Sequence, residues 1–338
     1  MATSLGRIGM FERIYVEDAI HDHPRTIDLL KRYPSAEAIR CSRYGEVFNP
    51  KRQNFRVQKS NPALILAEKR GEKVLRTPAG YGLGADQHYY FSHMLNCLYD
   101  CRYCFLQGMY RSSNFVLFVN YEDFVSDIRE IANSHSNEKC IFFSGYDCDS
   151  LALESLTGFA NHFLDLFQNL PNATLELRTK SVNVSPLLQR GALENVVVAF
   201  TLSPDLVAKS LEFKAPTLSA RLRAIAKLIS AGWKIGLRFD PLIYFDNYQQ
   251  VYQAFIDETL EQIPLSAIHS TTIGVFRSPK TIFNNMKSLY PEEPLFMGNL
   301  QLSNGLVRYP ENVETSLVEN ITKRVLQHIP ENLLFQQK

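Results

Sequence analysis

Short apolar runs alternate with amphipathic stretches through most of this chain. The apolar runs are rich in β-branched and aromatic residues and predict six strands, over residues 87–95, 139–144, 174–178, 195–202, 233–239 and 267–276. Between them, apolar residues recur every three or four positions and predict helices over residues 120–133, 153–167, 184–189, 218–231 and 248–262. Strands that alternate with helices indicate an α/β fold, in which helices cover a parallel sheet.

The N-terminal region follows another pattern. Residues 10–45 predict a small α/β unit with strands over 11–16 and 37–42 and a helix over 23–32. Residues 51–76 then carry eight basic and two acidic side chains, a local balance of +6. Such a segment is either a solvated linker or a surface that meets the phosphates of a nucleic acid.

The C-terminal region breaks the alternation once more. Asn304-Gly305 separates two apolar runs and predicts a β-hairpin within residues 290–309, followed by a helix over 313–328. We therefore expect three parts: an N-terminal α/β extension with the basic segment (1–85), a central α/β part (86–289), and a hairpin and helix packed on it (290–338).

Composition narrows the class of protein. Of 338 residues, 45% are hydrophobic and 21% charged, so the chain can bury a sizeable core, and the net charge of +1 gives no overall attraction to nucleic acid. Neither an apolar signal core nor a run of 18 apolar residues is present, so we expect no membrane partner and a cytoplasmic location. The six cysteines do not suggest a disulfide scaffold and suit a reducing compartment.

Three cysteines stand together after the first predicted strand. Cys97, Cys101 and Cys104 are spaced C-x3-C-x2-C, on a loop whose backbone is free to wrap around one centre. Thiolates select zinc, copper(I) or iron–sulfur clusters, and three of them leave one iron of a four-iron cluster open. Two alternatives remain: thiols buried in a core, or a zinc site with a fourth ligand from His93, Cys140 or Cys148.

The motif and its surroundings resemble a known family. C-x3-C-x2-C followed by an aromatic residue, here Phe105, resembles the signature of the radical S-adenosylmethionine superfamily. The stretch 96–107, NCLYDCRYCFLQ, resembles the cluster loop of the spore photoproduct lyase family, which repairs a UV-induced thymine dimer in DNA. The resemblance continues in Thr179-Lys180, in Phe200-Thr201, and in residues 218–232 and 14–46.

This resemblance implies a fold, an activity and cofactors. The fold would be the partial (β/α)6 barrel of the radical superfamily, and the activity that of a carbon–carbon lyase using a [4Fe–4S] cluster and S-adenosylmethionine. An electron from the cluster would cleave a carbon–sulfur bond of the cofactor and release a 5′-deoxyadenosyl radical. That electron would come from a reducing donor such as flavodoxin or ferredoxin, and the substrate partner would be DNA with damaged pyrimidines.

The resemblance also implies roles for particular residues. Cys97, Cys101 and Cys104 would ligate the cluster, and Tyr103 would pack beside it. Residues that follow predicted strands would bind the cofactor: Ser144, Gly145, Lys180 and Thr201.

The hydrogen donor for the substrate radical stays open between two residues. Cys148 has the weaker bond to hydrogen, whereas an ungapped comparison places Tyr146 at the donor position. The chain departs from the family elsewhere too, because Phe105 replaces a tyrosine and Asn299 stands where lyase hairpins carry an arginine. Two other functions therefore stay open: a radical enzyme acting on another nucleic-acid or nucleotide substrate, and a non-enzymatic, metal-stabilised nucleic-acid-binding protein.

Overall fold

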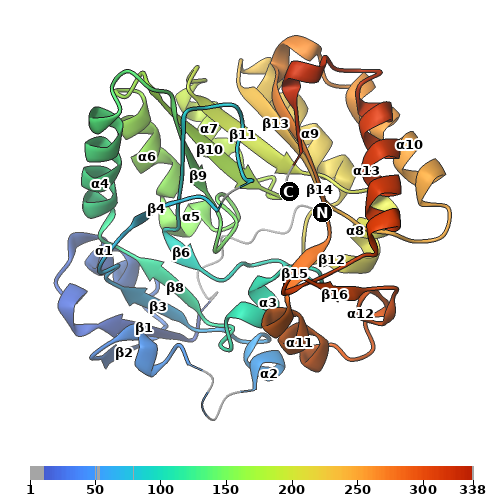
Figure 1. Ribbon diagram of the computed structural model, residues 1–338. Coiled ribbons are helices and arrows are strands. Elements are labelled where there is room, and N and C mark those ends of the chain that lie inside the picture. The colour runs from blue at the N-terminus through green and yellow to red at the C-terminus, as the bar shows by residue number, and fades with distance from the viewer. Residues whose placement is uncertain (1–10, 50, 52–53, 79, 337–338) are drawn as a thin grey trace.

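The computed structural model describes residues 11–49, 51, 54–78 and 80–336, and its main feature is a curled eight-stranded sheet (Figure 1). Six neighbouring strands run parallel, in the order β5, β9, β10, β11, β13, β14. They span Gln87–Phe91, Cys140–Ser144, Ala173–Thr179, Val196–Thr201, Lys234–Leu242 and Ile268–Val275. The predicted partial barrel of six parallel strands is confirmed.

Two short strands extend this sheet at its edges. β4 (Val74–Arg76) pairs antiparallel with β5, and β18 (Leu334–Gln336) pairs parallel with β14. The prediction of one strand over 87–95 was wrong in one respect, because the chain leaves the sheet after Phe91. Residues Met94–Leu95 form a separate strand, β6, which pairs with β8 of a different sheet.

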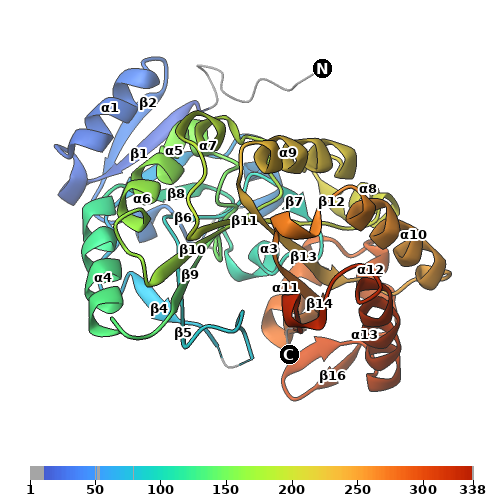
Figure 2. The same cartoon turned by 90° about the horizontal axis from the view of Figure 1, so that it is seen from above.

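Helices cover the outer side of the curled sheet, as Figures 1 and 2 show. They are α4 (Tyr121–Ser134), α6 (Phe159–Phe167), α7 (Ser185–Arg190), α9 (Leu218–Ser230) and α10 (Tyr248–Glu261). The predicted helix over 153–167 is split into α5 (Glu154–Thr157) and α6. Gly158 separates them in the left-handed conformation, with a φ of 57°, which interrupts the helical path.

A second sheet lies beside the first and has the strand order β2-β1-β3-β8-β6. The predicted unit supplies β1 (Arg13–Glu17), α1 (Pro24–Arg32) and β2 (Glu37–Cys41). β3 (Leu64–Ala67) and β8 (Phe115–Phe118) were not predicted, although all their residues are buried. Because β8 follows the cysteine loop in the chain, this loop is held between strands of the second sheet.

The predicted C-terminal hairpin is confirmed as β16 (Gln301–Ser303) and β17 (Leu306–Arg308). Asn304 and Gly305 form its turn with φ values of 49° and 79°, which the Asn-Gly pair accepts at little cost. β15 (Arg277–Pro279) adds a third strand, and α11 (Lys280–Leu289), α12 (Pro294–Met297) and the predicted helix, α13 (Glu311–Val325), complete this region. Within the described residues, no helix has the length and apolar character needed to cross a membrane.

Glu154 in α5 gives a prediction on stability. Its carboxylate is buried, and one oxygen accepts a hydrogen bond from the Ala160 N–H (2.9 Å) while the other has no partner. Burial raises the pKa of Glu154 from 4.5 to about 7. The folded state therefore holds this proton more tightly than the unfolded state, so the free energy of unfolding falls as the pH rises from 4.5 to 7, by about 3 kcal/mol.

We expect Glu154→Gln to remove most of this fall, since glutamine does not titrate. Thermal unfolding midpoints measured between pH 4.5 and 8 test this, with the exposed Glu130→Gln in α4 as the matched control. Parallel pH profiles for wild type and Glu154→Gln would contradict the assignment.

Candidate active site

The cysteine loop leaves β6 through a sharp turn at Asn96. This residue has a φ of 71°, and its side-chain amide donates to the carbonyls of Ser112 (2.7 Å) and Asn114 (2.6 Å). The Asn96 side chain thus links the two ends of the segment that contains the cysteine loop. Within the loop, β7 (Asp100–Cys101) pairs antiparallel with β12 (Glu212–Phe213), which fixes Cys101 opposite Glu212.

Cys97, Cys101 and Cys104 all line one cavity of about 270 Å³. In the described part of the chain, no three side chains of His, Cys, Asp or Glu converge closely enough to hold a single metal ion. Thiolates around one zinc ion would lie about 3.8 Å apart, given zinc–sulfur bonds of about 2.3 Å. A four-iron cluster takes each thiolate on a different iron, which suits three thiols that line one cavity.

Two of the proposed fourth zinc ligands, Cys140 and His93, do not line this cavity, whereas the third, Cys148, lines it together with the three cysteines. Cys140 begins β9, whereas the cavity lies at the opposite end of that strand, beside Ser144. His93 faces Cys148, with its Nδ1 4.0 Å from the Cys148 Sγ. Burial raises the pKa of the three cavity thiols, so a bound cation is needed to hold them as thiolates.

All ten predicted site residues line this same cavity. The structure brings together the three cysteines, Tyr103, Ser144, Gly145, Tyr146, Cys148, Lys180 and Thr201. They come from the cysteine loop and from the carboxyl ends of β9, β10 and β11, where active sites of α/β barrels lie.

Gly145 can only be a glycine in this arrangement. Its φ is 85°, and a Cβ atom would lie 2.6 Å from the Ser150 hydroxyl and 3.1 Å from the Arg178 carbonyl. The preceding Ser144 donates its hydroxyl to the Glu176 carbonyl (2.8 Å). The backbone after β9 is thereby held in place and carries no side chain at Gly145, which suits close contact with a cofactor.

Asp149 holds the loop after β9 against the end of β10. Its buried carboxylate accepts hydrogen bonds from the Thr179 hydroxyl and the Lys180 N–H, both 2.6 Å long. It also accepts from the backbone N–H groups of Leu151 and Ala152. Asp149 therefore sets the distance between the Ser144–Cys148 loop and Lys180.

A buried ion pair that the sequence analysis missed supports the other wall. Glu212 pairs with Arg221, and both side chains are almost fully buried. Glu212 also accepts from the Tyr103 hydroxyl (2.5 Å), while Arg221 donates to the Thr201 carbonyl (3.0 Å). Burial alone would raise the pKa of Glu212, but Lys180 and Arg221 lower it, so the carboxylate stays charged.

The Glu212–Arg221 pair thus contacts two predicted site residues, Tyr103 and Thr201. A third, Lys180, lies beside Tyr103, with its ammonium 5.4 Å from the centre of the ring. One signal for Arg221 was present in the sequence. It stands three residues after Leu218 and next to Leu222, on the apolar side of a predicted helix, where a charged residue needs a partner.

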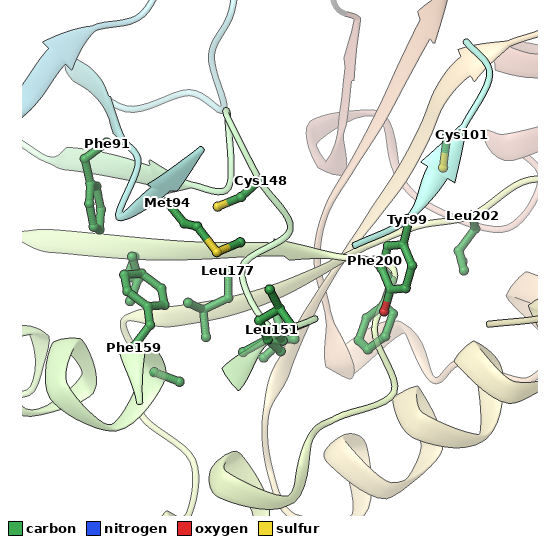
Figure 3. Packing of buried hydrophobic residues seen from close by; sticks show 14 of the residues in the cluster. Phe91, Met94, Tyr99, Cys101, Cys148, Leu151, Phe159, Leu177, Phe200 and Leu202 are labelled. Carbon is green, nitrogen blue, oxygen red and sulfur yellow. The ribbon is translucent and has the colours of Figure 1, made fainter. Parts of the chain in front are cut away.

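Cys148 and Tyr146 occupy different positions in the cavity wall. Cys148 is 5% exposed, and Figure 3 shows its sulfur beside Met94, with Cys101 on the far side of Tyr99. Tyr146 is 39% exposed, and its ring lies between Tyr90 (4.6 Å between centroids) and Phe105 (5.3 Å). The thiol is therefore the inner candidate and the phenol the outer one.

Part of the cavity lining combines aromatic rings with charges, and we call this part the outer half. Tyr81 and Tyr90 line it together with Arg178, Asp240 and Arg277. Arg277 donates to the Tyr81 hydroxyl (3.0 Å), which joins the glycine-rich loop before β5 to β15. Rings that offer a flat face beside arginines suit bases and phosphates.

The basic segment does not form one continuous free patch. Lys59 pairs with Asp100 (2.5 Å), Arg70 with Glu68 (2.6 Å) and Lys73 with Asp127 (3.7 Å). A role of residues 51–76 in contacting DNA stays a prediction.

A curled sheet of six parallel strands, with a three-cysteine loop after the first strand and a cavity at the carboxyl ends, is the architecture expected of a radical S-adenosylmethionine enzyme. The model of the family described as spore photoproduct lyase matches residues 86–332. The chain belongs to the spore photoproduct lyase family.

Individual relatives agree with this assignment. The spore photoproduct lyase of Clostridium acetobutylicum is 20% identical over 260 residues, 75% of each chain. That of Bacillus subtilis is 22% identical over 202 residues, 59% of each chain. A solved structure of a spore photoproduct lyase mutant with bound AdoMet and dinucleoside spore photoproduct has a TM-score of 0.83 at 18% identity, covering 97% of this chain and 98% of that chain.

The predicted family, fold and class of enzyme, a radical S-adenosylmethionine lyase, are therefore confirmed. The cofactors of this family are the predicted ones, a [4Fe–4S] cluster and S-adenosylmethionine. The chemistry of the lining fits both groups, because three thiols and the loop with Gly145 line the same cavity.

Proposed function

We propose that this chain repairs a spore-photoproduct-type thymine lesion in DNA. The observation that carries the proposal is that the ten predicted site residues line one cavity, together with tyrosines and arginines. When bound, the cluster and S-adenosylmethionine supply an organic radical, and a carrier such as flavodoxin or ferredoxin supplies the electron.

The residues of the inner half position the cofactor. Cys97, Cys101 and Cys104 would hold the cluster, and Ser144 and Gly145, which line the same cavity, would bind the amino group of S-adenosylmethionine. Lys180 and Thr201 would contact the rest of the cofactor, and the Tyr103 ring would pack beside it. The buried Glu212–Arg221 pair keeps Tyr103 and Thr201 in place, so Glu212 and Arg221 act as positioning residues.

The outer half holds the lesion. Tyr81 and Tyr90 offer faces on which thymine rings stack, and Arg178 and Arg277 face its carbonyl or phosphate oxygens. Arg178 is oriented by the buried Glu176, whose carboxylate also binds Arg238 (2.6 Å). The recognition of the lesion therefore depends on a charge network rooted in the sheet.

Cys148 completes the reaction by giving a hydrogen atom to the substrate carbon radical. The S–H bond breaks, a C–H bond forms on the thymine, and the unpaired electron remains on Sγ. The burial of Cys148 supports this role, because water and other hydrogen sources are kept away from the inner wall.

The test is anaerobic reconstitution with iron and sulfide, followed by product analysis on a synthetic spore-photoproduct dinucleotide. We expect visible absorbance of a cluster, cleavage of S-adenosylmethionine, and two intact thymines. Cleavage without repair would point instead to another nucleotide substrate, an alternative that the replacement of a family tyrosine by Phe105 favours. A colourless protein that only binds nucleic acid would overturn the proposal.

A further inference from the structure

A second hollow adjoins the cysteine loop and is separate from the cofactor cavity. It measures about 210 Å³ and is lined by four cations, Arg56, Lys59, Arg102 and Lys214, along with Ser60, Asp100 and Tyr290. They come from α2 (Phe55–Gln58), the cysteine loop, the residue after β12, and the end of α11. We call the four cations and Phe213 the cationic surface.

The acid in this hollow is already used by the fold. Asp100 accepts from Lys59 (2.5 Å) and the Tyr290 hydroxyl (3.3 Å), and it pairs with Arg102 (2.8 Å). The side chains of Arg56 and Lys214 are exposed. The hollow therefore presents net positive charge to the outside.

Apolar surface accompanies this charge. Phe213 is 42% exposed beneath the Arg102 guanidinium, which lies 4.4 Å from its ring centre, and Val57 on α2 is 68% exposed. Small surfaces that combine exposed apolar groups with one sign of charge are typical of brief, charge-steered protein encounters.

Lys214 is held in an unusual backbone conformation. Its φ of 63° lies in the left-handed region, which glycine and asparagine accept and which costs other residues free energy. Strained residues of this kind cluster at functional sites.

The hollow is connected to the cluster ligands by one side chain. Lys59 lines both this hollow and the cofactor cavity, which the thiols of Cys97 and Cys104 also line. Arg102 directly follows Cys101. No described residue of the outer half of the cavity also lines this hollow.

We propose that the cationic surface is the docking site of an acidic one-electron carrier protein. One electron would pass from the reduced carrier to the cluster held by the three cysteines, and the carrier would thereby be oxidised by one electron. This inference rests on the proposed function, since it requires a cluster on the three cysteines. S-adenosylmethionine and the lesion fill the cavity side of the loop, so the carrier approaches the cluster from the other side.

The test compares two reductants on the same holoenzyme. Cleavage of S-adenosylmethionine is driven either by an acidic flavodoxin or by dithionite, which is small and needs no docking surface. We expect Lys214→Glu to raise the flavodoxin concentration for half-maximal rate about tenfold, and Lys214→Asn by less, with unchanged dithionite rates. Asparagine accepts the left-handed conformation, so Lys214→Asn removes the charge without adding strain.

Lys31→Glu on α1 is the matched control for net charge, and it should leave both rates unchanged. An unchanged response of Lys214→Glu to flavodoxin would overturn the proposal. Weaker binding of DNA with the flavodoxin response intact would also overturn it, and would show that the surface binds phosphates. An equal loss of rate with both reductants would show that Lys214 has only a structural role. If wild type fails to cleave the cofactor with dithionite, the proposed function itself is wrong.

Discussion

Replacing any one of Cys97, Cys101 or Cys104 with alanine is expected to abolish cleavage of S-adenosylmethionine. Each thiolate holds a different iron, and alanine offers no donor atom in its place. All three side chains line the cavity, and although Cys101 also belongs to the core cluster, most of that cluster comes from the two sheets and their helices. The variants should therefore stay folded, at a cost of about 1 kcal/mol for a lost thiol.

Two measurements check this expectation after anaerobic reconstitution. The iron content and visible absorbance report the cluster, and the release of 5′-deoxyadenosine reports the reaction. Cys41→Ala is the matched control, because Cys41 is a buried cysteine of β2 outside the cavity. A triple alanine variant that still binds iron and cleaves the cofactor would contradict the assignment of the cluster ligands.

The central sheet could be predicted because each of its strands is recognisable from its own run of apolar residues. Residues 195–202 are apolar on both faces, and β11 is buried throughout, as a strand in the middle of a parallel sheet must be. The Asn304-Gly305 turn was predictable for a local reason too, since few other pairs accept both φ values.

The second sheet could not be completed from the sequence. β3 and β8 are four-residue strands with 47 residues between them, and neither has a local partner. Their pairing of Leu64 with Phe115 depends on the cysteine loop, which returns the chain to the first strands. A short apolar run predicts burial, but only the tertiary structure decides what covers it.

The same distinction applies to the site. Residues in a motif were predictable because the chemistry of three thiolates fixes their types and spacing. Lys59 was not predictable, because its partner Asp100 lies more than 40 residues away in the chain. Glu212 was not predictable either, because it acquires its role from the neighbouring strand, where it lies opposite Cys101. Supporting residues of this kind have no spacing rule, so the structure is needed to find them.

Replacing Cys148 with alanine is expected to leave consumption of S-adenosylmethionine intact while clean repair is lost. The radical on the substrate would still form, but its nearest hydrogen source would be gone, so it should end in abnormal adducts. Tyr146→Phe is the matched control on the same loop, and it should give two intact thymines because the Cys148 thiol remains. Mass spectrometry of the products from a synthetic lesion separates these results.

The structure gives a reason to favour the thiol. Cys148 lies in the buried wall beside Met94, whereas Tyr146 is more exposed and its ring contacts Tyr90 and Phe105. A buried donor meets the radical before solvent does, and an S–H bond is weaker than the O–H bond of a phenol. Abnormal products from Tyr146→Phe, with clean repair by Cys148→Ala, would transfer the role to the tyrosine. Clean repair by both variants would show that neither residue is the donor, and the hydrogen would have to come from another group lining the cavity.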